Sequence, residues 1–455
     1  MNKEYLIEEK PFKAILFFAI PMIIGNLFQQ FYTMADSVVV GQFVGENALA
    51  AVGASYSLTN VFISIAIGGG VGASVITSRY FGAADYGKMK CSIYTALFSF
   101  LIVSIFLGTV GILFGKQIMV LLNTPDNILD QATAYLNIYF LGLPFLFMYN
   151  IFSAMFNALG KSRIPLYLLV FSSVFNIGLD LIMVCIFQMG VAGVAWATLI
   201  AQGISAILAA LLFLKELHSY SVSNHVGIFS CKELKKMTRI ALPSILQQST
   251  VSIGMMLVQS VVNGFGSEML AGFTSAMRVE SICIVPMAAM GNAISSYTAQ
   301  NIGAGKLKRV ITGYHTSYGI IAGFAILICI IVEVFHTPII SLFLGEDGTQ
   351  LAIQTGNGCI TFMGWFFGLI GLKMITDGLL RGAGDMKMFT IANLVNLSIR
   401  VFVALAFAPR FGIAMVWYAV PLGWAANYII SYFQYRTGKW KKLFNNHHDR
   451  IKSME

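Results

Sequence analysis

Long apolar runs separated by short polar segments make up most of the chain. Each run has at least about 20 residues, the length that a helix needs to cross a hydrocarbon core of roughly 30 Å. The runs are continuous and do not alternate with period 2, which favours helices over a transmembrane barrel. We predict one membrane-spanning helix over each of twelve runs: 14–43, 48–78, 91–114, 131–158, 165–187, 190–214, 238–264, 269–300, 311–335, 352–380, 388–408 and 412–436.

The second half of the chain repeats the first at an offset of 220 to 222 residues. The Ala-Ile-Pro sequence that ends at Pro21 recurs as Ala-Leu-Pro ending at Pro243, and Asn176 recurs as Asn396. Repeats of this kind are typical of secondary transporters, whose binding site lies where the repeats meet. A doubled bundle without a transport role is the alternative. We therefore predict an all-α polytopic membrane protein: twelve transmembrane helices in two pseudo-symmetric six-helix lobes.

The same pattern divides the chain into four segments. Residues 1–214 form the N-terminal six-helix lobe, 241–436 form the C-terminal six-helix lobe, and 437–455 form a basic cytoplasmic tail. The linker 215–240 contains a capping-box spacing, with Ser230 three residues before Glu233. Apolar residues then recur at helical spacing. The linker is therefore predicted to contain a short amphipathic helix on the cytoplasmic surface.

The placement of the basic residues predicts the orientation. With the N-terminus inside, only Lys116 and Arg410 of the 29 Lys and Arg fall in outer loops. Three more, Arg278, Lys373 and Arg400, fall well within spans, which leaves 24 in inner segments and at the inner ends of spans. This asymmetry is the positive-inside pattern. We predict a multi-pass protein of the cell membrane, the inner membrane in a bacterium, with both termini cytoplasmic.

Composition and motifs exclude several classes of function. Since 57% of the residues are hydrophobic and 11% are charged, the chain lacks the polar surface of a soluble enzyme. The net charge of +9 follows from the topology and from contact with lipid, and it does not indicate a nucleic-acid partner. The six Cys form no C-x-x-C pair, and no nucleotide-binding or hydrolase motif occurs. We expect a monomer that is not an enzyme and carries no cofactor.

Polar residues within the spans of the first half gather on a few helical faces. Ionisable groups in a bilayer core are costly, and they usually face a cavity or a partner. Asp36 ends a polar face of the first span, and Asp180 follows Asn176 by one turn in the fifth. The polar residues on these faces and on spans 4 and 6 are Asn26, Gln29, Gln30, Thr33, Asp36, Asn150, Ser153, Asn157, Asn176, Asp180, Thr198 and Gln202.

Helix geometry places three of these residues at a similar depth. At about 1.5 Å per residue, Asp180 lies roughly 22 Å above the cytoplasmic start of its span, and Thr198 lies roughly 12 Å below the outer start of its own. Asp36 is also near the outer end of its helix. Carboxylate, amide and hydroxyl oxygens are hard ligands that suit H⁺ or Na⁺, and two acids in a low dielectric cannot both stay charged cheaply. We predict a coupling site here; a structural hydrogen-bond network is the alternative.

The second half has no matching acid pair, because Arg400 stands where the repeat would place the counterpart of Asp180. Glu280 has a similar estimated depth, so we predict an ion pair between Glu280 and Arg400, with a structural role as the simpler interpretation. Lys373, Asp377 and Arg381 follow one another at intervals of four and are interpreted as a charge ladder at the cytoplasmic membrane surface. We predict that a chamber for apolar, often cationic, ligands includes Gln29, Gln30, Thr33, Asn157, Gln248, Arg278 and Glu280.

In these residues the chain resembles the MATE family, the multidrug and toxic compound extrusion transporters. The resemblance covers the full chain and rests on 29–41, Asn176-x-x-x-Asp180, 300–304 and 380–385. It implies antiport of organic cations against H⁺ or Na⁺ through a V-shaped chamber that alternates its access. It also implies that the first helix bends at Pro21, where a backbone hydrogen bond is lost. The cation ligands that it implies are Asp36, Asn176, Asp180 and Thr198, with Asn150 nearby.

The chain departs from other members of that family, which place an acid in the seventh span and another in the middle of the tenth. Residues 241–265 contain no acid, and Asp377 is near the cytoplasmic end of its span. This favours a coupling site in the first lobe. A lipid-linked saccharide flippase stays open as an alternative, although it would require a more basic chamber than Arg278 and Arg400 provide. A channel is the third possibility, and it would need a continuous polar pore.

Overall fold

The computed structural model describes residues 4–122, 124–222, 227–345 and 348–441, and the regular structure in these ranges is entirely helical. Within these ranges, ten helical segments are long and apolar enough to cross a membrane. The pair α12 (Gln350–Gly364) and α13 (Phe367–Ala383), bent by 52°, would add an eleventh. The twelfth predicted span is also helical, as α15 (Ala414–Thr437), but it is less apolar. The protein is thus an all-α polytopic membrane protein, as the sequence predicts.

The chain forms two compact units, one of residues 24–245 and one of residues 1–23 together with 246–455. Two helices belong to both units: α2 (Pro11–Val39) and α8 (Cys231–Asn263). Each helix passes from one unit to the other two residues after a proline, Pro21 or Pro243. These prolines are equivalent in the sequence repeat. The lobe boundaries expected at 214 and 241 stay a prediction.

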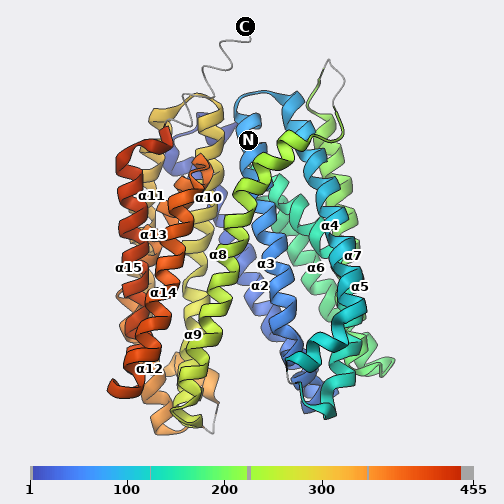
Figure 1. Ribbon diagram of the computed structural model, residues 1–455, viewed down its shortest axis with the longest axis vertical. Helices are drawn as coiled ribbons and strands as arrows, with labels where there is room; N and C mark the ends of the chain where they lie inside the picture. The colour runs from blue at the N-terminus through green and yellow to red at the C-terminus, as the bar shows by residue number, and fades with distance from the viewer. Residues whose placement is uncertain (1–3, 123, 223–226, 346–347, 442–455) are drawn as a thin grey trace. The chain divides into compact units, whose positions relative to one another are not determined.

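The unit of residues 24–245, called the N unit, is built around α5, which packs against α3, α4 and α7 (Figure 1). Five-residue π-helical segments, η1 and η2, extend α2 and α6. Besides its parts of α2 and α8, the unit contains η1 (Val40–Val44), α3 (Glu46–Gly82), α4 (Tyr86–Leu121), α5 (Asp126–Ala158), α6 (Arg163–Leu181), η2 (Ile182–Ile186) and α7 (Gly190–His218).

In the other unit, called the C unit, α13 is the central helix, since it packs against α10, α11 and α15. Figure 1 shows α13 beside α11 and α10. Besides its parts of α2 and α8, this unit contains α1 (Tyr5–Glu8), α9 (Ser267–Cys283), α10 (Val285–Gly303), α11 (Leu307–Leu344), α12, α13, α14 (Met386–Phe411) and α15.

The amphipathic segment expected in the linker is not a separate helix. It forms the first turns of α8, which continues through Pro243 into the seventh span. The backbone N–H of Glu233 donates to Ser230 Oγ (3.4 Å), which confirms one half of the capping box. The Glu233 side chain instead accepts hydrogen bonds from Tyr80 Oη (2.8 Å) and Lys236 Nζ (2.7 Å). These contacts attach the start of α8 to the end of α3.

Two glycines on α3 let α8 approach closely. A Cβ atom at Gly68 would lie 2.6 Å from the backbone nitrogen of Ile245, and one at Gly72 would lie 2.6 Å from the carbonyl oxygen of Met237. No side chain fits at either distance. The Gly68-x-x-x-Gly72 spacing is therefore a helix-packing motif, as membrane helices commonly use small residues in this way.

A short N-terminal helix was not expected from the polar N-terminus. Tyr5, Leu6 and Ile7 on α1 are buried, and α1 packs against α10. Backbone carbonyls of this segment are satisfied by side chains of the C unit: Asn301 Nδ2 donates to Leu6 O (3.1 Å), and Arg309 Nη2 donates to Glu9 O (2.6 Å). The start of α2 is thereby anchored to the C unit.

Candidate functional site

The four-residue spacing of Asn176 and Asp180 within α6 produces a buried polar cluster in the N unit. Both side chains are almost fully buried, at 1% and 0% exposed. With the amide oriented to satisfy its neighbours, Asn176 Nδ2 donates to Asp180 Oδ2 (3.0 Å) and to Tyr32 Oη (2.8 Å). Asn176 Oδ1 accepts from the backbone N–H of Thr198 (3.1 Å). Three helices, α2, α6 and α7, thus meet beside one carboxylate.

The backbone next to this cluster is irregular on both helices that carry the predicted acids. α6 becomes the π-helical segment η2 two residues after Asp180, and α2 becomes η1 four residues after Asp36. The two segments contact each other, and an apolar cluster that includes Val40, Val184 and Val194 is buried where they meet α7. π-Helical turns often mark functional sites, because they widen the helix locally. This packing brings the ends of the two acid-bearing helices together.

The side chain of Asp36 lies outside the described part of the structure, although its backbone belongs to α2. The contact between Asp36 and Asp180 therefore stays a prediction. Tyr32, which the sequence analysis did not single out, lies one helical turn before Asp36 and supplies the α2 contact to Asn176. Its position on the same helical face as Asp36 could have identified Tyr32 as a candidate from the sequence.

The other polar residues expected in the N unit lie apart from this cluster or make local contacts. Asn150 Nδ2 donates to Leu146 O of its own helix (2.8 Å), and Thr33 Oγ1 donates to Gln29 O (2.9 Å). Gln29 is exposed, and Gln30 is half-buried. Asn157 is half-buried, and its Oδ1 atom has no hydrogen-bond partner among the described residues. The coupling role of Asn150 stays a prediction.

A small cavity adjoins the cluster at Thr198. It has a volume of about 10 Å³ and is lined by Thr198, Gln202, Tyr135 and Tyr139 together with apolar residues. That volume corresponds to about one water molecule. The cavity is large enough for a single water or a small ion and too small for an organic cation.

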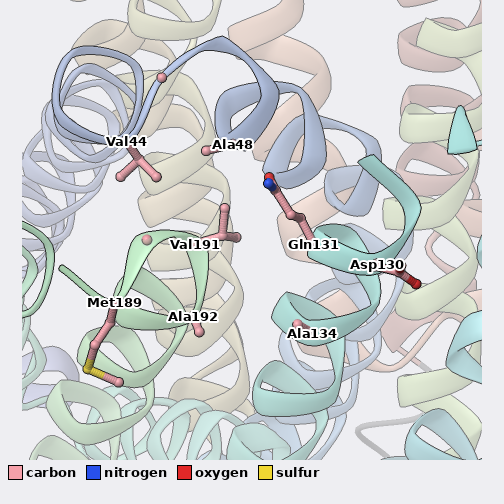
Figure 2. A pocket seen from close by; sticks show the side chains of 10 residues that line it. Val44, Ala48, Asp130, Gln131, Ala134, Met189, Val191 and Ala192 are labelled. Carbon is pink, nitrogen blue, oxygen red and sulfur yellow. The ribbon is translucent and has the colours of Figure 1, made fainter. Parts of the chain in front are cut away.

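A larger hollow of about 580 Å³ lies elsewhere in the N unit, between the start of α3, α5 and the start of α7. Figure 2 shows that its walls are mostly small and apolar, with Gln131 pointing towards Ala48 and Asp130 pointing away from the other labelled side chains. Asp130 forms an exposed ion pair with Lys116 (3.3 Å). Among the residues whose side chains the structure describes, none of those predicted for the coupling site or the chamber lines this hollow.

The residues predicted for the chamber in the second half differ in exposure. Arg278 is exposed, Gln248 is half-buried and Glu280 is buried at 5% exposed. The charges of Glu280 and Arg400 interact electrostatically, but the described residues contain no ion pair between them within 4.0 Å. Arg400 Nε is buried without a hydrogen-bond partner in the described part of the chain. The expected direct pair is thus not formed.

The interpretation of Lys373, Asp377 and Arg381 as a ladder at the membrane surface is wrong. All three side chains are buried in the C unit, at 4%, 2% and 9% exposed. Lys373 Nζ lies 3.2 Å from Asp377 Oδ2, and Arg381 Nη2 donates to Asn292 Oδ1 (2.7 Å). The spacing correctly places the charges on one face of α13, but that face packs against other helices and not against water or headgroups.

Comparison with known proteins gives consistent matches. A family model described as MatE matches residues 21–182 and 243–406, one segment in each half of the internal repeat. The probable multidrug resistance protein YpnP of Bacillus subtilis is 30% identical over 444 residues, which cover 95% of this chain and 97% of that protein. The multidrug export protein MepA of Staphylococcus aureus is 22% identical over 417 residues, 91% of each chain. A solved structure described as the outward-facing conformation of a multidrug resistance MATE family transporter has a TM-score of 0.88 at 25% identity, covering 97% of this chain and 99% of that one.

Proposed function

The chain belongs to the MatE family of membrane transporters, and from this premise we propose that it exports amphiphilic, often cationic, organic compounds in exchange for H⁺ or Na⁺. It is a multi-pass membrane transporter and not an enzyme. The names of its relatives support multidrug efflux as the broader activity. The expected inner membrane location, cytoplasmic termini and monomeric state are part of the proposal.

The observation that carries the proposal is the fully buried carboxylate of Asp180, which lies beside the polar groups of Asn176, Tyr32 and Thr198. A buried carboxylate is stable when it is paired, hydrogen-bonded or neutralised by a bound cation. Asn176 and Thr198 carry oxygen atoms of the kind that H⁺ or Na⁺ prefers, and the adjacent cavity gives a small ion room. In the present arrangement Asn176 Oδ1 accepts from the Thr198 backbone N–H, so the amide would have to turn for this oxygen to bind a cation. Asn176 orients the carboxylate, and Asp36 is proposed as the second acid.

Coupling is proposed to act through α2. This helix contributes Tyr32 to the cluster. Its residues up to 23 belong to the C unit and those from 24 onwards belong to the N unit, so the change of unit comes two residues after Pro21. A proline inside a helix removes one backbone hydrogen bond and permits bending. Arrival of the cation near Asp180 would change the contacts of Tyr32 and so bias the bend at Pro21. The organic substrate would then lose its binding contacts on the outward side.

The proposal predicts uphill transport in proteoliposomes. A fluorescent lipophilic cation should be moved against its own gradient when a proton or a Na⁺ gradient is imposed, and an ionophore that collapses the effective gradient should abolish this movement. Liposomes without protein are the control. Movement that is only ever downhill would favour a channel, and transport of a lipid-linked sugar without transport of the dye would favour a flippase.

A further inference from the structure

A closed polar network surrounds the carboxylate of Asp377 in the C unit. Asp377 Oδ2 lies 3.2 Å from Lys373 Nζ and accepts from Asn393 Nδ2 (3.4 Å), while Oδ1 accepts from Ser431 Oγ (2.8 Å). Lys373 Nζ also donates to Asn393 Oδ1 (3.1 Å). Three helices, α13, α14 and α15, supply these groups. The ammonium therefore holds two of the oxygens that a cation would otherwise bind.

The network is buried and rich in donors. Ser431 and Asn427 are 0% exposed, and Ser431 Oγ also lies 3.4 Å from Asn427 Oδ1. Asn427 Nδ2 has no hydrogen-bond partner among the described residues. A donor is thus left over, whereas the side-chain oxygens of Asp377 and Asn393 are already engaged. The single hydroxyl proton of Ser431 is directed to Asp377 Oδ1 at 2.8 Å, and not to the more distant Asn427 Oδ1. In this state a metal ion could bind the oxygens of Asp377 only by displacing one of the groups that now donate to them.

The charges around Asp377 also oppose a further cation. Lys373 and Arg381 lie on the same helix, and Arg381 interacts electrostatically with Asp377 while its guanidinium donates to groups of α10. Besides Ser431 and Asn427, α11 and α15 place uncharged hydroxyls beside α13: Tyr314 and Tyr318 hydrogen-bond to Thr376, and Tyr428 hydrogen-bonds to Tyr318. Two cationic groups thus accompany one carboxylate, and like charges in a low dielectric repel strongly.

We propose that Lys373 is a tethered counter-ion that fills a latent Na⁺-type cation site at Asp377, so that the C unit carries no coupling ion. This inference rests on the proposed function. If the C unit carries no coupling ion, the cation that drives transport must bind in the N unit. The interiors of the predicted spans of the first half contain no Lys or Arg, whereas those of the second contain three. Without the ammonium, Asp377 Oδ2 and Asn393 Oδ1 would become available beside Ser431 Oγ and Asn427 Oδ1.

Removal of the Lys373 ammonium should allow the latent site at Asp377 to bind Na⁺. Lys373→Met keeps most of the length and the apolar stem of the side chain but leaves Asp377 buried without its counter-ion, a state that is costly unless a cation enters. The four oxygen atoms named above are suitable ligands for Na⁺. We expect Lys373→Met to bind about one more Na⁺ per chain than the unchanged protein.

The test counts radioactive Na⁺ bound to the purified full-length protein. Lys373→Met should raise the count by about one, Lys373→Met with Asp377→Asn should remove the increase, and Lys373→Arg should leave the count unchanged. Monodispersity on size exclusion establishes that each variant is folded. Asp377→Asn alone provides a second test that does not depend on the folding of Lys373→Met: it should not change the count of the unchanged protein.

Two results would overturn the inference. One is a folded Lys373→Met protein with no additional Na⁺, and the other is a loss of bound Na⁺ in Asp377→Asn, which would make Asp377 an operating site. The same measurements in an Asp180→Asn background separate this inference from the proposed function. The increase in Lys373→Met should persist there, even if Asp180 proves to have no part in coupling.

Discussion

Asp180→Asn is expected to abolish gradient-driven export while leaving the protein folded. Asparagine has nearly the same shape and keeps an oxygen that can accept from Asn176 Nδ2, so the packing of α6 against α7 should survive. The charge that attracts H⁺ or Na⁺ is lost. We expect the gradient-dependent part of dye export to fall by roughly 100-fold, which is near the upper end of coupling between two sites. The measurement is the initial rate in proteoliposomes with an imposed gradient.

The matched control is Asp130→Asn in the same unit. The Asp130 side chain is 90% exposed and pairs with Lys116 at the surface, where an ion pair contributes little to stability. The rate for this variant should stay close to that of the unchanged protein. An Asp180→Asn protein that still exports at the full rate under a gradient would remove Asp180 from the coupling mechanism.

Gly378→Val is expected to prevent α13 from packing against α10. A Cβ atom at Gly378 would overlap the carbonyl oxygen of Gly291, and one at Gly291 would lie 2.8 Å from the carbonyl oxygen of Met374. The obstacle is backbone on both helices, so a rotamer change cannot relieve it. Overpacking of a well-packed interior costs about 1–3 kcal/mol, and we expect the upper part of that range or more here. The midpoint of thermal unfolding in detergent is the measurement.

Gly319→Val provides the control for this change. Gly319 lies on α11 in the same unit and is exposed, and a Cβ atom added to it would meet no atom of the described neighbouring helices within 4 Å. Its midpoint should stay close to that of the unchanged protein. An unchanged midpoint for Gly378→Val as well would show that α10 and α13 do not approach each other as closely as these distances require.

The sequence was sufficient for features that depend on spacing along one helix. The four-residue interval between Asn176 and Asp180 predicts that they share one face of a helix, and in the structure the two side chains are hydrogen-bonded. The apolar runs likewise predict the helices, because a bilayer leaves the backbone few other ways to satisfy its hydrogen bonds.

Features that depend on what a helical face packs against were not available from the sequence. Lys373 and Asp377 share a face at a spacing equally suited to a headgroup region and to a buried pair, and only the neighbours Asn393 and Ser431 distinguish the two. The backbone carbonyl of Leu6 accepts a hydrogen bond from Asn301, almost 300 residues away in the sequence. The pattern of residues around either position does not identify a partner so distant in the sequence.

The most direct test of cation exchange at Asp180 uses the reverse direction of transport. Proteoliposomes are prepared with an organic cation on one side and no imposed gradient of H⁺ or Na⁺, and the flux of both ions is recorded. Because coupling is reciprocal, the downhill movement of the organic cation should drive one of the two ions in the opposite direction. We predict this counter-flux for the unchanged protein and for Asp130→Asn, and none for Asp180→Asn. An unchanged protein that releases the organic cation without any counter-flux, or a full counter-flux in Asp180→Asn, would contradict the account.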